Sequence, residues 1–215
     1  MELTREQIQK VAEYLNVKKI TFVDVRFEIL DHIVSDIEIK MTTNNSSFNE
    51  VFKEVATKWN LQFKDTSSVY FGLAFSAPEI IIHKAKKMYV KFYVLLFASY
   101  FVPLLLFTNY NFNIQNPSEN TLFIIPQTIT VFCLVSFLWM FFNKENKTKT
   151  TFSFILKTQS LSVFIGLITL IVFLSKPKEL KGIHIGMLSS FLFSTYTYFY
   201  FYKKHKEAVN IFKAI

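Results

Sequence analysis

Four long apolar runs constrain the fold of this chain more than any other feature of its sequence. The hydrocarbon core of a bilayer is about 30 Å thick and needs roughly 20 mostly apolar residues in a helix, because backbone groups left unpaired there are costly. The runs cover residues 92–110, 121–142, 155–175 and 183–202. The stretches between them are short and polar, so we predict two antiparallel hairpins that form a four-helix transmembrane bundle.

The composition supports a membrane protein and excludes several other classes. Hydrophobic residues make up 51% of the chain and charged residues only 19%, whereas an ordinary soluble domain carries about 25% charged residues. The single cysteine, Cys133, rules out an intrachain disulfide and a cysteine-based zinc site. The sequence contains neither an HExxH motif nor a glycine-rich phosphate loop. We therefore expect no cofactor and no enzymatic activity.

The excess of positive over negative charge comes from the membrane part of the chain. The formal net charge is +8, but residues 1–75 hold 9 Lys and Arg against 11 Asp and Glu. The rest of the chain holds 15 basic and 5 acidic residues. A mildly acidic N-terminal part would be repelled by phosphate backbones, so we expect no direct binding of nucleic acid.

The lysines beside the apolar runs predict the orientation, since cytoplasmic loops are enriched in Lys and Arg. The lysines before the first, after the second and after the fourth run fall on one side. On the opposite side, residues 111–120 hold none and the second short loop holds only Lys176, Lys178 and Lys181. We expect both termini to be cytoplasmic in a bacterial inner membrane, with the first span as targeting signal and lipid as a partner. The expected membrane-interface residues are Lys84, Lys86, Lys87, Lys91, Lys157, Lys203 and Lys204.

Residues 1–75 predict a cytoplasmic domain of three amphipathic helices. Capping boxes at Thr4–Gln7 and Ser47–Glu50 begin the first and the third helix. The second helix carries apolar residues in alternating steps of four and three, which places them on one face. That stripe consists of Val23, Phe27, Leu30, Val34, Ile37 and Met41, widened by Ile29 and Ile33. The third helix presents Phe48, Phe52, Val55, Trp59 and Phe63.

Two further segments complete the predicted all-α fold. Residues 76–91 are expected to form a tether helix that runs directly into the first span, with Pro78 in its first turn. Residues 203–215 are expected to form a basic cytoplasmic tail. The four spans occupy residues 92–202 between these two segments.

The N-terminal third of the chain resembles a known family. The block DVRFEILDHI at residues 24–33, followed by the helix at 48–63 and a multispan segment, resembles bacterial membrane proteins with an N-terminal HAAS-type helical domain. In that family the genes often accompany PadR-like transcriptional regulators. The resemblance implies a domain that acts in signalling rather than in catalysis.

An acidic ridge on the second predicted helix is the main candidate for partner docking. Its residues are Asp24, Glu28, Asp31 and Glu38, with Ser35 in the same spacing and His32 and Asp36 at the edge. The ridge suits a basic protein partner or the chain's own cytoplasmic lysines, and a merely solvated face is the alternative. Glu28, Asp31 and His32 are also candidates for metal ligands, since carboxylates and an imidazole on one helix face can bind a metal ion. They are weak candidates, because a second helix should supply matching ligands and the third helix offers only Glu50 and Glu54 and no histidine.

Small residues spaced four apart mark two expected helix-packing grooves. They are Ser162 and Gly166 on the third span, and Gly186, Ser190 and Ser194 on the fourth. Small side chains let helix backbones approach closely, which matters because lipid supplies no hydrophobic drive for helix association. We expect the third and fourth spans to pack together, with homodimerisation through the same face as the alternative.

These features favour a non-enzymatic membrane protein whose cytoplasmic helical domain acts as a signalling or partner-docking module, anchored or gated by the transmembrane bundle. A first alternative is an accessory subunit of a membrane transporter or secretion complex, contacted through the hydroxyl-rich fourth span. A second alternative is a metal-dependent lipid-modifying enzyme that uses Glu28, Asp31 and His32. The spans contain no Asp or Glu, which disfavours active transport.

Overall fold

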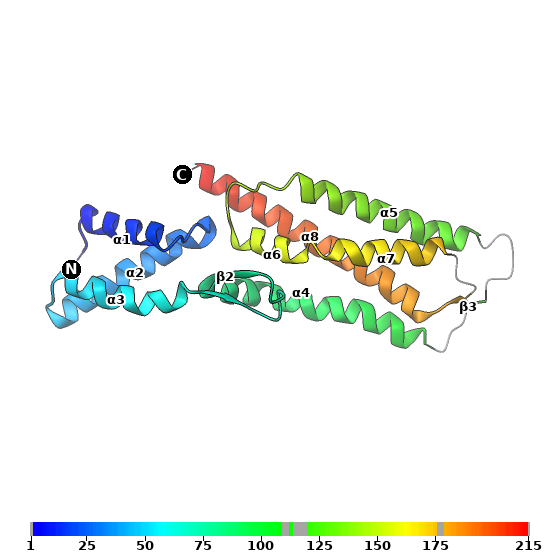
Figure 1. Cartoon of the computed structure of the whole chain (residues 1–215), viewed down its shortest axis with the longest axis horizontal. Helices are drawn as coiled ribbons and strands as arrows, with labels where there is room; N and C mark the ends of the chain where they lie inside the picture. Colours follow the sequence, from blue (N-terminus) through cyan, green and yellow to red (C-terminus); the bar gives the residue numbers. More distant parts are fainter. Residues whose placement is uncertain (1, 109–111, 114–119, 176–178, 215) are drawn as a thin grey trace. The chain divides into compact units, whose positions relative to one another are not determined.

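The computed structural model describes residues 2–108, 112–113, 120–175 and 179–214, and it is mostly helical (Figure 1). Its chain divides into two compact units. The first unit comprises Met1–Lys87, Asn146–Ile155 and His205–Ile215, and the second comprises Met88–Glu145 and Leu156–Lys204. The N-terminal helical part thus shares a unit with two stretches that come much later in the sequence.

Three short helices begin the first unit: α1 (Arg5–Val17), α2 (Val23–Asn44) and α3 (Phe48–Gln62). Both predicted capping boxes are present. The Thr4 hydroxyl accepts a hydrogen bond from the backbone N–H of Gln7, whose side chain accepts one from the N–H of Thr4. Ser47 and Glu50 make the corresponding pair at α3. Each pair satisfies two N–H groups that a helix start otherwise leaves unpaired.

The apolar stripe predicted for α2 is correct in part, because Ile29, Ile33, Ile37 and Met41 are buried. The buried residues follow steps of four only: they are Val25, Ile29, Ile33, Ile37 and Met41. Phe27 is half exposed, and Leu30 and Val34 are only partly buried. An α-helix turns by about 100° per residue, so residues four apart lie about 40° apart around the axis. A row in steps of four is therefore inclined to the helix axis, which suits helices that cross at an angle. The packing against α1 and α3 selected that row.

The expectation of an all-α chain needs one correction, because two short pairs of strands are present. Strand β1 (Asp65–Ser67) pairs antiparallel with β2 (Ser76–Pro78), in the first unit. Strand β3 (Phe112–Asn113) pairs antiparallel with β4 (Glu179–Leu180), in the second. Pro78 therefore ends a strand, and α4 begins at the next residue.

Helices also make up most of the rest of the described chain: α4 (Glu79–Leu106), α5 (Asn120–Phe142), α6 (Thr151–Gln159), α7 (Ser162–Leu174) and α8 (Gly182–Ala214). The predicted tether and first span form one continuous helix, α4. The predicted third span begins earlier than expected and is interrupted at Ser160 and Leu161 between α6 and α7. The start of α6 at Thr151 belongs to the first unit, whereas α7 belongs to the second.

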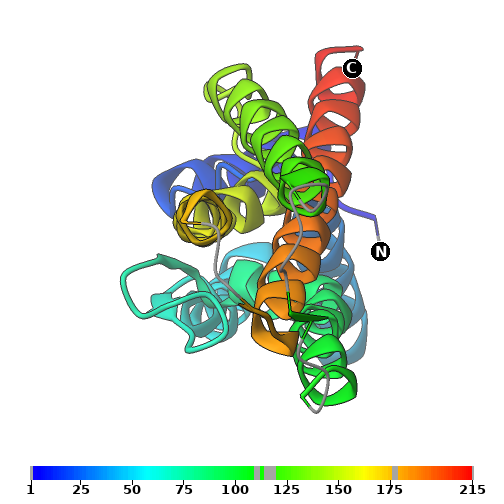
Figure 2. The same ribbon diagram turned by 90° about the vertical axis from the view of Figure 1, so that its right-hand side faces the viewer.

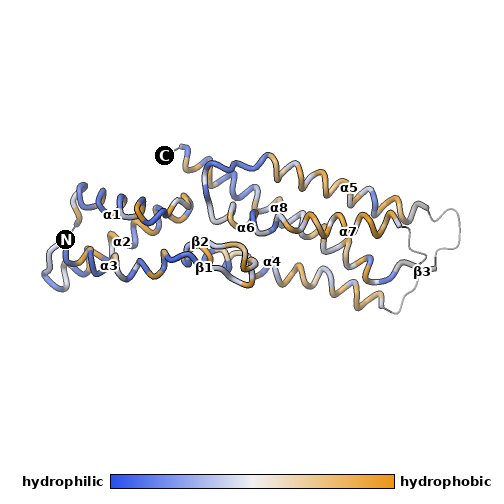
Figure 3. Tube along the Cα trace, viewed as in Figure 1, coloured by the Kyte–Doolittle hydropathy of each residue, from blue (hydrophilic) through white to orange (hydrophobic). Residues whose placement is uncertain are grey.

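Three helical stretches are long and apolar enough to cross a membrane, among the residues described: Glu79–Leu106, Phe123–Phe142 and Thr151–Leu174. Figure 3 shows that apolar residues predominate along these three stretches. Helix α8 does not meet that hydropathy criterion, since its middle is rich in Ser, Thr and Tyr. The predicted end of the first span at 110, most of the outer loop 111–120, and Lys176 and Lys178 lie outside the described residues.

Helix α8 supplies much of the core of the second unit. Phe191, Tyr198 and Phe201 on this helix are fully buried, and the Phe137 ring of α5 packs 4.2 Å from the Tyr198 ring. Figure 2 shows α8 between α4 and α5. The outward faces of this unit carry large apolar side chains, among them Phe132 and Leu105. Such an exterior suits lipid rather than water.

Candidate functional site

The predicted acidic ridge of α2 begins at a buried polar junction. The N–H of Val23 donates to the carbonyl of Lys149 at 3.0 Å, so the start of α2 is bonded to the segment before α6. One residue on, the Asp24 carboxylate accepts a hydrogen bond from the N–H of Thr151 at 2.9 Å. A carboxylate at the start of a helix satisfies an unpaired N–H and complements the positive end of the helix dipole. Asp24 therefore caps α6 from α2.

The same junction includes a residue near the C-terminal end of α8. Thr150 and Ser153 exchange side chain–backbone hydrogen bonds of 3.0 Å, which form a second cap on α6. The Thr150 hydroxyl also lies 2.8 Å from Nδ1 of His205 on α8. Thr150, Thr151 and His205 are all buried. We call Asp24, Thr150, Thr151, Ser153 and His205 the buried junction; it joins three stretches of the first unit that are distant in sequence.

The next residue of the ridge, Glu28, is paired with a lysine of the tether region. Lys84 Nζ donates to Glu28 Oε2 at 2.6 Å and to the Asp24 carbonyl at 3.4 Å. The hydrogen bond from Lys84 lowers the pKa of Glu28 below its ordinary value, and partial burial opposes this shift. Lys84 was expected at the lipid interface, but its ammonium group binds the ridge. One of the chain's own lysines thus covers this part of the ridge.

The far end of the ridge lines a shallow hollow. Glu38 Oε1 accepts a hydrogen bond from the N–H of Leu3 at 2.9 Å, which holds the N-terminal segment beside α2. The hollow has a volume of about 330 Å³. Its lining residues are Glu2, Glu38, Ile39, Thr42 and Thr43. Ile39 is largely exposed there, so an apolar side chain lies between acidic groups.

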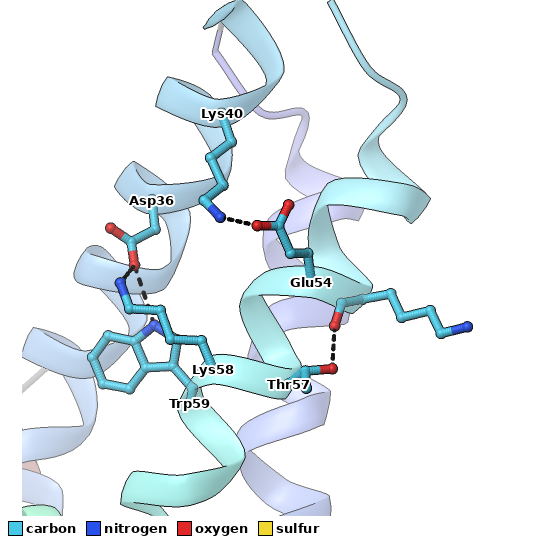
Figure 4. Close-up of polar contacts among 7 residues, drawn as sticks. Asp36, Lys40, Glu54, Thr57, Lys58 and Trp59 are labelled. Atoms are coloured by element: carbon cyan, nitrogen blue, oxygen red, sulfur yellow. Dashed lines mark hydrogen bonds and ion pairs between the residues drawn. The ribbon is translucent and has the colours of Figure 1, made fainter. Parts of the chain in front are cut away.

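A second set of polar contacts on α2 was not predicted. Asp36 Oδ2 accepts hydrogen bonds from Lys58 Nζ at 3.0 Å and from Trp59 Nε1 at 3.3 Å, and Lys40 is paired with Glu54 (Figure 4). These contacts connect α2 with α3. The sequence pattern had placed Asp36 only at the edge of the ridge. The one signal for its role in packing α2 against α3 was Trp59, because the indole N–H of a buried tryptophan usually needs a hydrogen-bond acceptor.

Asp31 and His32 remain exposed on the ridge. Within the described ranges, no group of three or more His, Cys, Asp and Glu side chains could hold a metal ion. The weak metal candidates Glu28, Asp31 and His32 are thus not brought together as such a group. The ridge therefore offers carboxylate charge at the exposed Asp31 and, about two helical turns further along α2, at the acidic rim of the hollow.

The small residues of the predicted grooves lie at close helix contacts in the second unit. A Cβ atom on Gly166 would lie 2.8 Å from Leu134 Cδ2 of α5 and closer still to the Phe191 ring of α8. A Cβ atom on Gly186 would lie 2.7 Å from the Tyr100 carbonyl of α4. Gly166 of α7 therefore faces α5 and α8, whereas Gly186 of α8 faces α4.

The other predicted groove residues are arranged around these glycines. Ser190 and Ser194 are buried, and the Ser190 hydroxyl donates to the Met187 carbonyl of its own helix at 3.0 Å. Ser162 is partly buried at the first turn of α7. The neighbouring Ser189, which was not in the predicted set, donates to the Ser99 carbonyl of α4.

An apolar groove of about 480 Å³ lies between α5 and α8 of the second unit. Its lining residues are Phe132, Cys133, Val135, Ser136, Trp139, Met140, Thr195, Tyr196 and Phe199. Trp139 and Tyr196 are more than half exposed. Both have an apolar body and a polar tip, which suits an interface between hydrocarbon and water.

The remaining predicted membrane-interface lysines lie mostly on exposed positions. Lys87 and Lys203 are exposed, Lys204 is partly buried, and Lys157 is exposed on α6. Lys86 Nζ lies 4.4 Å from the centroid of the Tyr70 ring, and Lys91 Nζ lies 5.3 Å from that of Phe92. Aromatic faces attract ammonium groups at such distances.

Comparison of the chain with protein-family models, with curated proteins and with solved structures finds no match. The site is therefore interpreted from its geometry.

Proposed function

We propose that this is a non-enzymatic integral membrane protein whose first unit is a docking and signalling module, with the membrane helices as anchor or gate. The observation that supports this most is the buried junction. It bonds the start of α2 to the cap of α6 and to α8, and these two helices continue into the second unit. A movement along either helix would therefore change the hydrogen bonds at the start of α2. The resemblance of the N-terminal third to HAAS-type domains also favours a role in signalling.

The docking face we propose consists of the exposed Asp31 together with the acidic hollow around Ile39. Asp24, Glu28 and Glu38 already bind groups of this chain, so they are less accessible than the predicted ridge implied. An apolar residue between carboxylates suits a basic amphipathic segment of a cytoplasmic protein. A partner of this kind would gain both charge attraction and burial of Ile39.

We also propose that residues 183–202 of α8 form a fourth span, which would place both termini on the cytoplasmic side of a bacterial inner membrane. Two of the threonine hydroxyls that lower the hydropathy of α8 are satisfied within the helix. Thr195 Oγ1 donates to the Phe191 carbonyl at 2.9 Å and Thr197 Oγ1 to the Phe193 carbonyl at 2.8 Å. Such bonds reduce the cost of placing hydroxyls in hydrocarbon. A helix that packs inside a bundle also needs less apolar surface than one that faces lipid.

The docking proposal is tested by site-specific photo-crosslinking of the full-length protein in its native membrane. A photoreactive side chain replaces Asp31 or Ile39, and the controls place it at Lys10 or Glu13, which are exposed on α1. We expect a discrete adduct with a cytoplasmic protein from positions 31 and 39 only. Equal adducts from both faces, or none from either, would contradict the proposal.

The coupling part of the proposal has a separate readout. Thr150→Val removes the hydroxyl that contacts His205 but keeps the side-chain shape. We expect faster amide hydrogen exchange in the first turns of α2 and α6 in this variant, because both are held at the junction. Exchange that increases equally in α1 would indicate general destabilisation instead.

A second candidate function is an accessory subunit of a larger membrane complex, favoured by the groove between α5 and α8. Its exposed Trp139 and Tyr196 resemble the aromatic anchors of protein interfaces. Extraction from native membranes in polymer-bounded discs should then recover another integral protein, and Tyr196→Ala should lose it. A single monodisperse species from the wild type would contradict this candidate.

A further inference from the structure

The loop between β1 and β2 has an apolar tip. Residues 68–75 fold through backbone hydrogen bonds from Phe71 N–H to the Ser68 carbonyl at 3.0 Å and from Phe75 N–H to the Gly72 carbonyl at 3.1 Å. Gly72 has a φ angle of +84°, a backbone conformation that residues other than glycine rarely adopt. At this tip Val69 is 83% exposed and Leu73 is 72% exposed. Turn tips in water usually carry polar residues.

The loop is attached firmly to its own unit on the opposite side. Phe71, which lies between the two exposed residues, is buried, and its ring packs edge-on against Phe154 at 5.3 Å between centroids. The strand pair closes the base of the loop, and β2 leads directly into α4. Val69 and Leu73 are therefore presented outward by a supported loop.

The loop also lies beside the basic part of a helix that is apolar and long enough to cross a membrane. Lys86 Nζ of α4 lies 4.4 Å from the Tyr70 ring centroid, and Lys87 is exposed next to it. Lys86 precedes Phe92, where the predicted first span begins, by six residues, or about 9 Å along the helix axis. If α4 crosses the bilayer, Tyr70 and its lysine lie at the depth of the lipid headgroups.

We propose that residues 68–75 form a membrane-interface loop, which inserts Val69 and Leu73 into the boundary between headgroups and acyl chains. The occupant of this apolar surface is the bilayer itself, and the ammonium groups of Lys86 and Lys87 attract anionic headgroups. A tyrosine between apolar and charged groups suits the same depth. This inference rests on α4 as a span and does not depend on the docking face.

The test measures the depth of labelled residues in the full-length protein in nanodiscs of mixed anionic and zwitterionic lipid. In a Cys133→Ser background, a nitroxide label is attached at Val69→Cys or Leu73→Cys. The control sites are Val17→Cys and Leu61→Cys, where apolar side chains are 76% and 72% exposed in the same unit. Val94→Cys on α4 serves as a lipid-facing reference. Collisions with oxygen report lipid, and collisions with a nickel chelate report water.

We expect a several-fold higher ratio of oxygen to nickel collisions at positions 69 and 73 than at positions 17 and 61, approaching the ratio at 94. The ratio should fall when the lipid is purely zwitterionic or in the Lys86→Gln/Lys87→Gln variant. Ratios at 69 and 73 equal to those of the controls would overturn the inference. Protection from both reagents that depends on the protein-to-lipid ratio would also overturn it, because a second copy of the chain would then cover the loop. Circular dichroism of each labelled protein verifies that it is folded.

Discussion

The two units both bury large apolar side chains, but they differ in the side chains that they expose and in the hydroxyl groups that they bury. In the first unit the buried row of α2 is aliphatic, and charged residues such as Asp31 face outward. In the second unit Thr130, Thr169 and Ser194 are buried, whereas Phe132, Leu105 and Phe142 are exposed. A core that repels water needs apolar residues inside, but helices in lipid gain little by burying them and pack instead through small residues. The second unit accordingly combines a buried aromatic core with buried hydroxyls at close helix contacts and an apolar exterior.

Polar contacts differ between the units in the same way. In the first unit they connect separate elements: Arg26 donates to the Ile20 carbonyl at 2.8 Å, and the Tyr14 hydroxyl donates to the Ala56 carbonyl at 3.0 Å. Burial of Tyr14 raises the pKa of its hydroxyl to about 12. In the second unit most hydroxyl groups bond to their own helix, as Thr195 does. Local bonds satisfy hydroxyls without a partner helix, so packing there depends on shape.

The sharpest test of this difference replaces isoleucine with alanine in both units. Ile33 on α2 is fully buried, so Ile33→Ala should lower the free energy of unfolding of the first unit by about 3 kcal/mol. Ile168→Ala on the exposed face of α7 is the matched change, and we expect an effect below about 0.5 kcal/mol. Fluorescence of Trp59 in a Trp139→Phe background reports unfolding of the first unit. Comparable losses at both sites would contradict the contrast.

The second test concerns close packing in the second unit. Gly166→Ala places a methyl group against Leu134 and the buried Phe191 ring, and overpacking of this kind should cost about 2 kcal/mol. The measurement is the midpoint temperature of thermal unfolding in detergent, monitored by the fluorescence of Trp139. Leu167→Phe adds more volume at an exposed position of the same helix and should leave the midpoint unchanged. A neutral Gly166→Ala would show that this contact adjusts freely.

A third change tests whether polar contacts hold separate elements together in the first unit. Asp24→Ala removes the acceptor of the Thr151 N–H and should cost about 1 kcal/mol. Asp24→Asn keeps an acceptor and should cost less. Asp31→Ala is the control, because Asp31 is exposed. Chemical denaturation followed by Trp59 fluorescence measures all three, and equal values for Asp24→Ala and Asp31→Ala would show that the cap contributes nothing.

The smallest expected effect belongs to the Glu28–Lys84 ion pair, since both side chains are partly exposed. Exposed pairs contribute about 0.5 kcal/mol. The pKa of Glu28 is lowered in the folded protein, so its stabilisation is complete above the ordinary value of 4.5 and is lost as the pH falls below it. A double-mutant cycle of Glu28→Gln and Lys84→Gln at neutral and acidic pH measures the coupling. A coupling that is unchanged at acidic pH would exclude the ion pair as its source.

Local signals in the sequence predicted several elements correctly. Thr4 and Ser47 begin α1 and α3 as expected, because a capping box depends only on residues three apart. The continuity of α4 followed from the absence of a helix breaker between Glu79 and the apolar run. Three membrane-length apolar helices followed from length and hydropathy. Four spans, the orientation and the docking residues stay predictions.

Other predictions failed where distant segments decide the outcome. The stripe of α2 was expected to run through Phe27, with Ile29 and Ile33 only widening it, yet these two isoleucines are fully buried and Phe27 is half exposed. Both rows are apolar, so the sequence alone did not determine which of them meets the neighbouring helices. Strands β1 and β2 were missed for a related reason, because each has only three residues and a pattern of period two is unrecognisable at that length.

The sequence by itself determined which segments are helical and which are apolar enough for lipid, because hydrogen bonds within a helix and transfer from water depend on neighbouring residues. Only the tertiary structure decided that Asp24 caps α6, that Lys84 binds Glu28, and that His205 meets Thr150. Those contacts join residues that are far apart in the chain, so their formation depends on how the helices pack. The partners of the acidic ridge were therefore a property of the fold and could not be inferred from its spacing.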